Sequence, residues 1–159
     1  MNKVDTVSQG SFLEYQASRL QALINEMVKC CEDRKIYENQ KFGLPYAEIK
    51  CLLLFQGERY LTVKSIASRL DVAKSRVTKL VNGLLSKGYV ERIDDPKDTR
   101  VKLISLTQAG QRKIQEVEAF HLSLHKKLIQ CIDPEDRGEL LSYLEQLRNG
   151  MEEVKQEFA

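Results

Sequence analysis

The chain has 159 residues, of which 42% are hydrophobic and 30% are charged, and its formal net charge is +2. This length and apolar content suffice for one full-sized core and exclude a disordered polyelectrolyte. The mean hydropathy is −0.40, and no apolar run approaches the roughly 18 residues that a membrane-spanning helix needs. Because the polar N-terminus also has no apolar signal core, we expect a cytoplasmic protein.

Helical spacing of apolar residues predicts one long helix over residues 11–38, which Gly43-Leu44-Pro45 ends. Its apolar stripe consists of Leu13, Ala17, Leu20, Ile24, Met27 and Cys31. A second helix is expected from Pro45 to about Phe55, since proline suits the first turn of a helix.

The next segments predict a helix-turn-helix. Thr62 can cap a short helix from Val63 to Leu70, and Asp71-Val72-Ala73 forms a tight turn. A helix from Lys74 to about Lys87 follows. Its expected buried side chains are Val77, Leu80, Val81, Leu84 and Leu85.

Two runs of strand-forming residues then predict a hairpin. They are Tyr89–Ile93 and Val101–Leu106, and residues 94–100 join them as a long charged loop. This order is typical of a winged helix-turn-helix, in which the hairpin is the wing. The fold class is therefore mainly α with a small β-hairpin wing.

The C-terminal part predicts two more long helices. Thr107 opens the first, and Asp133-Pro134-Glu135-Asp136 has the residues of a strong start for the second. Together with residues 11–38, these helices carry more apolar surface than one small winged domain covers. A two-fold dimer is expected, with its DNA-reading helices about 34 Å apart.

The positive charge is concentrated in the middle of the chain. Residues 45–107 hold 12 Lys and Arg against 7 Asp and Glu, whereas residues 133–159 hold 3 against 8. A basic segment in an otherwise neutral or acidic chain is typical of a module that binds a polyanion. The alternative for each charge is an ordinary solvated helix face.

The outward face of the helix from Lys74 has small or hydrogen-bonding side chains and no acid, as a helix in the DNA major groove requires. Arg76 is the candidate for reading guanine, Lys74 and Lys79 suit phosphates, and the wing can reach a minor groove. The candidate DNA-binding residues are Thr62, Lys64, Ser65, Lys74, Ser75, Arg76, Thr78, Lys79, Asn82, Lys97, Asp98 and Arg100.

Four segments carry a family resemblance, namely Leu70–Leu84, Gly88–Arg92, Asp95–Arg100 and Leu106–Gly110. In this order and spacing they resemble the MarR family of bacterial regulators, closely over residues 45–112. The resemblance implies an obligate homodimer on a pseudo-palindromic operator of double-stranded DNA. It usually implies a repressor that a small ligand or oxidation releases.

The resemblance also implies the domain organisation. An N-terminal dimerisation helix occupies residues 1–44, a winged helix-turn-helix lobe residues 45–107, and C-terminal dimerisation helices residues 108–159. Two positions depart from the family. Ala73 stands where a capping Ser is common, and Thr99 stands where a second wing arginine is frequent.

Three kinds of signal remain open. For small-molecule sensing, the candidate lining residues are Tyr15, Arg19, Tyr37, Phe42 and Tyr46. For thiol sensing, Cys31 and Cys51 are expected in the core, Cys30 can face outward, and Cys131 closes an apolar stripe. For metal sensing, His121 and His125 are four residues apart but lack a third ligand, so no metal is expected.

Two other classes of function are alternatives to DNA binding. We expect no enzyme and no cofactor, since the chain has no Gly-rich phosphate loop and no nucleophile elbow. A winged-helix interaction module that does not read DNA is the other alternative, and the five bases within residues 64–79 argue against it.

Overall fold

The computed structural model describes residues 3–95, 98 and 102–158. The helices are α1 (Lys3–Phe42), α2 (Tyr46–Leu53), α3 (Val63–Leu70), α4 (Lys74–Ser86), α5 (Gln108–Gln130) and α6 (Arg137–Glu157). The strands are β1 (Leu61–Thr62), β2 (Val90–Asp94) and β3 (Lys102–Leu106). A mainly helical fold with a small antiparallel sheet confirms the expected fold class.

The contacts divide the chain into two compact units, residues 1–111 and residues 112–159. Over the residues that the structure describes, every helix is too short or too polar to cross a membrane.

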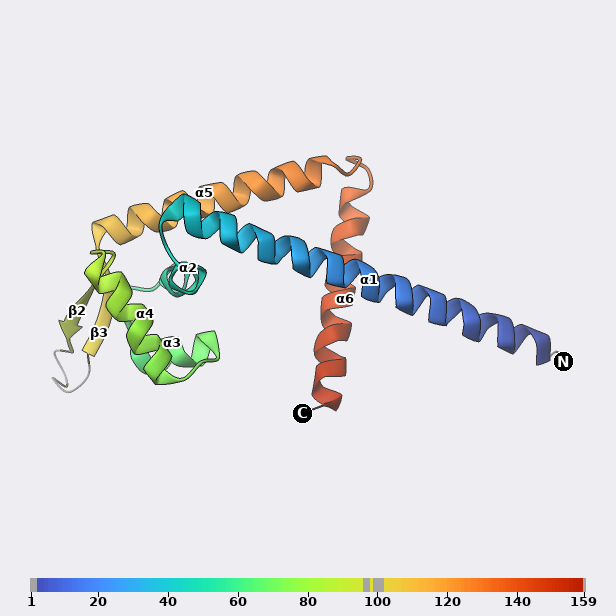
Figure 1. The fold of residues 1–159 in the computed structure, drawn as a ribbon, viewed down its shortest axis with the longest axis horizontal. Coiled ribbons are helices and arrows are strands. Elements are labelled where there is room, and N and C mark those ends of the chain that lie inside the picture. The colour runs from blue at the N-terminus through green and yellow to red at the C-terminus, as the bar shows by residue number, and fades with distance from the viewer. Residues whose placement is uncertain (1–2, 96–97, 99–101, 159) are drawn as a thin grey trace. The chain divides into compact units, whose positions relative to one another are not determined.

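The first unit contains the helix-turn-helix and the hairpin (Figure 1). Its core comes mainly from α2, α3, α4 and β3, which lie together in Figure 1. The buried side chains include Ile49, Leu52, Phe55, Ile66, Val77, Val81, Leu84, Leu103 and Ile104. This apolar cluster holds α4 against the other elements of the unit, leaving its opposite side to solvent.

The predicted breaks between these helices are confirmed by their backbone geometry. Gly43 has a φ of +64° after α1, and Gly88 has a φ of +73° after α4, values that favour glycine. Asp71 also has a positive φ, of 52°, between α3 and α4. The Thr62 hydroxyl oxygen accepts a hydrogen bond of 3.0 Å from the Ser65 amide, so the predicted cap of α3 is present.

The sheet has the strand order β1-β3-β2, with both pairs antiparallel. Val90 pairs with Leu106 and Asp94 with Lys102 in the predicted hairpin. The short strand β1 was not predicted; its Leu61 pairs with Ile104. A strand of two residues is too short to show an alternating pattern.

Several sequence-based expectations are wrong. The first helix runs over Lys3–Phe42 rather than over residues 11–38, and Leu80 and Leu85 of α4 are half-buried rather than buried. The final helix begins at Arg137 rather than at Pro134, because the Asp136 amide donates to the Asp133 carbonyl at 3.0 Å and closes a turn first. Cys31 was expected in the core but is exposed. Other apolar side chains of the same α1 stripe are exposed too, since Leu13 is 67% exposed and Met27 is 52% exposed.

Candidate nucleic-acid interface

The outward face of α4 brings six of the predicted DNA-binding residues together. Val77, Val81 and Leu84 are completely buried on the inner face, at intervals of four and three residues that place them on one side of a helix. The opposite face exposes Lys74, Ser75, Arg76, Thr78, Lys79 and Asn82. This face carries three cations and no acid.

The Arg76 and Val77 amides close the first turn of α4 by donating to the Ala73 carbonyl at 3.0 and 3.2 Å. Ala73 is the N-cap and makes no side-chain cap, as predicted for alanine, which has no hydrogen-bonding side chain. The Thr78 hydroxyl donates to the Lys74 carbonyl at 3.0 Å, so its oxygen remains as an acceptor at the surface. The first backbone amides of a helix have no acceptor within the helix, so the start of α4, with Lys74 and Ser75 exposed, suits a phosphate.

The start of α3 holds three further candidates. Lys64 is exposed, whereas Thr62 and Ser65 are half-buried. Because the Thr62 oxygen already caps the Ser65 amide, its role in the structure is to fix the start of α3. Lys64 remains the side chain best placed here to reach a phosphate.

The hairpin is tied to α4 by a bond that the sequence did not predict. The Arg92 Nη2 atom on β2 donates to the Asn82 Oδ1 atom on α4 at 2.6 Å. An exposed ion pair joins Lys102 and Asp94 across the two strands. Lys97 and Arg100 lie outside the described residues, and Asp98 is exposed.

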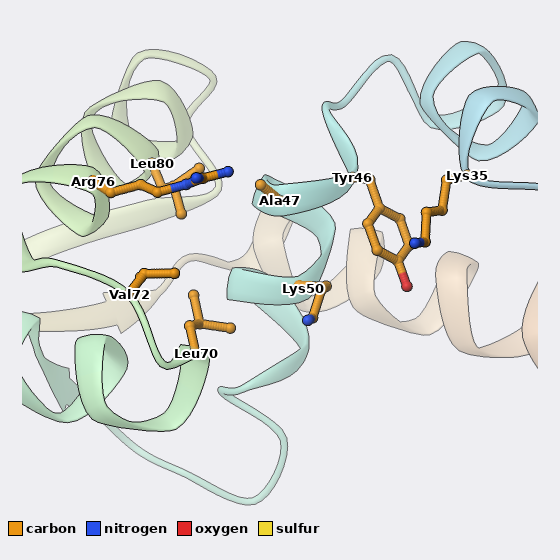
Figure 2. A pocket seen from close by; sticks show the side chains of 8 residues that line it. All are labelled: Lys35, Tyr46, Ala47, Lys50, Leu70, Val72, Arg76 and Leu80. Atoms are coloured by element: carbon orange, nitrogen blue, oxygen red, sulfur yellow. The ribbon is translucent and has the colours of Figure 1, made fainter. Parts of the chain in front are cut away.

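A cavity of about 270 Å³ lies beside α4, and we refer to it as the cationic cavity (Figure 2). It is lined by Lys35, Tyr46, Ala47, Lys50, Leu70, Val72, Arg76 and Leu80. The Lys35 ammonium lies 5.3 Å from the centre of the Tyr46 ring, and Arg76 extends toward Ala47 in Figure 2. The described lining therefore combines three cations with an apolar floor and has no acid.

Among the predicted effector-binding residues, Tyr46 lines this cavity. Phe42 is buried in the core, while Tyr15, Arg19 and Tyr37 are exposed on α1. The other lining residues, from α1 to α4, were not predicted to bind an effector, because the sequence shows which residues are apolar but not which helices face each other across a gap.

The thiols differ in their environment. Burial raises the pKa of the Cys51 thiol to about 12, and the negative charge of Glu48 adds to this shift. Cys30, Cys31 and Cys131 are exposed. Cys51 is therefore a core residue, as its apolar neighbours in the sequence predict.

The two histidine rings of α5 meet edge to face, with their centres 6.5 Å apart and their planes at 76°. The Nδ1 atom of His125 lies 2.6 Å from the His121 carbonyl oxygen, and that contact uses one nitrogen of the ring. Across the described part of the chain, no group of three or more His, Cys, Asp or Glu residues is arranged to hold a metal ion.

The comparison with known proteins points to one family. A sequence profile of the MarR family matches residues 42–101. YfiV, an uncharacterized HTH-type transcriptional regulator of Bacillus subtilis, is 24% identical over 152 residues, which are 85% of this chain and 94% of YfiV. MdtR, an HTH-type transcriptional repressor of the same organism, is 26% identical over 119 residues, or 75% of this chain and 77% of MdtR.

Solved structures share the fold. A mutant of MepR from S. aureus superimposes with a TM-score of 0.76 at 19% identity, over 82% of this chain and 97% of that one. Another MepR mutant, bound to an oligodeoxyribonucleotide, has a TM-score of 0.61 at 21% identity, over 85% and 97%.

Proposed function

Because the chain is a transcriptional regulator of the MarR family with a winged helix-turn-helix, we propose that it is a homodimeric repressor. It binds a pseudo-palindromic operator in double-stranded DNA through α4 and the wing, and a small ligand releases it. It works in the bacterial cytoplasm, where such an operator lies.

The exposed face of α4 is the observation that carries this proposal. In this proposal Arg76 reads guanine with its planar guanidinium, whereas Lys74 and Lys79 bind phosphates. Asn82 is held by Arg92 and therefore couples the wing to the same face. A helix that reads DNA needs an exposed face without acids over its apolar side. A helix that binds another protein has no such requirement.

The dimer proposal is supported by the apolar side chains that the single chain leaves in solvent. On α1 these are Phe12, Leu13, Tyr15, Leu20, Leu23, Met27 and Val28. On α6 and its C-cap they are Leu141, Tyr143, Leu144, Met151, Val154 and Phe158. Uncovered apolar surface of this extent marks an interface. The repressor role is supported by the relative MdtR, and DNA binding by the MepR structure with bound oligodeoxyribonucleotide.

The cationic cavity is the place we propose for the effector. Lys35, Lys50 and Arg76 favour an anion, and the apolar floor favours a small organic one. Since Arg76 belongs both to this cavity and to the exposed face of α4, a bound anion would draw its guanidinium away from DNA. Operator affinity would then fall because the ligand prefers the state that cannot bind DNA.

Replacing Arg76 by Ala tests the reading of the α4 face. The loss of one bidentate base contact should weaken binding to the operator by about 1–3 kcal/mol and relax base preference at that position. The measurement is fluorescence anisotropy with DNA from upstream of the protein's own gene and with a scrambled duplex, at two salt concentrations.

Two matched variants separate charge from geometry. Arg76→Lys keeps the charge and removes the planar fork, so it should also lose base preference. Lys126→Ala removes one exposed cation from α5 and should leave that preference intact. Unchanged operator affinity in Arg76→Ala would show that this face does not read bases, and salt-insensitive behaviour of the unmodified protein would favour an interaction module instead.

A further inference from the structure

A buried carboxylate joins α2 to the DNA-reading helix from beneath. Glu48 of α2 is only 7% exposed, and its two oxygens lie 3.1 and 2.9 Å from the Lys87 Nζ atom at the C-cap of α4. A charge this deeply buried has to be paired. It is not used by the predicted DNA contacts, all of which are at the opposite surface of α4 or on other elements.

The structure also explains why α4 has a glycine in its interior at position 83. A Cβ atom on Gly83 would lie 2.2 Å from the Glu48 Oε1 atom. Glycine weakens the interior of a helix relative to alanine, so its presence here has a local cause. The carboxylate occupies the space that any other side chain would fill.

These contacts fix α4 at two points one turn apart. Glu48 touches the backbone surface at Gly83 and pairs with Lys87, whose ammonium also lies 3.4 Å from the Gly83 carbonyl oxygen. The cation is well placed at the C-terminal end of the helix dipole. Apolar contacts do not have a preferred direction, whereas these hydrogen bonds do, so they define the rotation and depth of α4 on α2.

We propose that Glu48 and Lys87 are positioning residues that hold α4 at the rotation needed to read bases, although neither is placed to touch DNA. The inference rests on the proposed function of α4 in DNA reading. Buried ion pairs add little net stability and in several systems select one packing arrangement. Bases are read by hydrogen bonds that tolerate only small displacements. A small rotation of α4 should therefore lower the affinity for the operator before it lowers the affinity for other DNA.

The test is the double variant Glu48→Met/Lys87→Met. It fills the same space, leaves no buried charge unpaired and keeps the net charge of the chain. We expect a midpoint of thermal unfolding close to that of the unmodified protein and an unchanged affinity for scrambled DNA. Affinity for the duplex from upstream of the protein's own gene should fall roughly tenfold, the loss expected for one base contact. Equal affinity for that duplex would overturn the proposal.

Two controls separate positioning from general stabilisation. Lys87→Arg keeps a cation within reach of the carboxylate and should preserve operator affinity. Lys113→Gln/Glu116→Gln removes an ion pair of 2.7 Å from α5 without a change of net charge, and it should leave specificity intact. A similar loss in this control would mean that any lost ion pair lowers affinity, and would overturn the proposal.

A further variant keeps the test decisive if the double variant does not fold. Gly83→Ala forces the carboxylate away from Lys87, and operator affinity should again fall while affinity for scrambled DNA persists. Adding Glu48→Ala removes the clash without restoring the pair, so the specificity should stay low although stability recovers. Full recovery of operator affinity in the Gly83→Ala/Glu48→Ala variant would show that the ion pair is not needed, and would overturn the proposal.

Amide hydrogen exchange distinguishes this inference from the proposed function. If the unmodified protein prefers no duplex, the proposed function fails, and exchange of the α4 amides in the double variant still tests the positioning. If the double variant increases the exchange rate of the α4 amides more than that of the α3 amides, the positioning role is supported, because α4 is then less firmly held. Unchanged protection of α4 overturns it.

Discussion

The buried thiol of Cys51 is expected to react slowly with oxidants and alkylating reagents. Because burial raises its pKa to about 12, it is a neutral thiol at pH 8 and below, and only the thiolate reacts quickly. We expect a maleimide at pH 8 to modify the exposed Cys131 in the native protein and to leave Cys51 unmodified. Mass spectrometry of tryptic peptides measures both, and labelling of Cys51 after unfolding in guanidinium is the control. Modification of both thiols at the same rate would contradict this reading.

Residue-scale features could be predicted where their cause is local. The Thr62 cap, the turn at Asp71 and the missing cap at Ala73 each depend on neighbours within a few residues. The pairing of Glu48 with Lys87 joins residues 39 positions apart. No periodicity or propensity carries that information, so the support beneath α4 appears only in three dimensions.

Helices and strands could also be predicted where their cause is local. Long amphipathic helices and the hairpin follow from hydrophobic spacing, and α3 was predicted with its bounds. The start of α6 was misplaced because Asp133 to Asp136 have the composition of a helix start, whereas their backbone forms a separate turn. The candidate site was predictable on α4, where one face of one helix carries it. The cationic cavity was not, since it is assembled from α1, α2, α3 and α4.

The junction between the hairpin and α5 leads to a prediction for Gly110. A Cβ atom there would lie 2.0 Å from the Tyr89 carbonyl oxygen, and a backbone atom cannot swing aside. The Thr107 hydroxyl fixes the same approach by donating to the Gly88 carbonyl at 2.6 Å and accepting from the Gly110 amide at 3.1 Å. Gly110→Ala should lower the free energy of unfolding by about 1–3 kcal/mol, as overpacking does. Urea denaturation followed by circular dichroism measures it.

Gly138 on α6 is the matched control. An added Cβ there would meet no atom within 4 Å. Alanine at this helical position should therefore be neutral or stabilise the protein by up to about 1 kcal/mol. If Gly110→Ala were as stable as Gly138→Ala, the close approach of Tyr89 to α5 would not exist in solution.

At the scale of the whole molecule, stability and function are expected to depend on a second copy of the chain. The contacts separate residues 1–111 from residues 112–159, and both units leave large apolar side chains in solvent. The three-part organisation at residues 44 and 107 stays a prediction. In the single chain α6 has no buried residue, so its apolar side chains are available to a partner, as the proposed dimer requires.

Replacing Leu144 and Leu147 by Asp tests that dependence. Leu144 is 46% exposed on α6, and two carboxylates on a face that pairs in a dimer would have to be desolvated. The variant should sediment as a monomer and lose operator binding, because one half-site provides only half of the contacts. Ser142→Asp/Asn149→Asp adds the same charge to exposed polar positions of α6 and should remain a dimer that binds. A Leu144→Asp/Leu147→Asp monomer with undiminished operator affinity would show that the regulator acts without a partner.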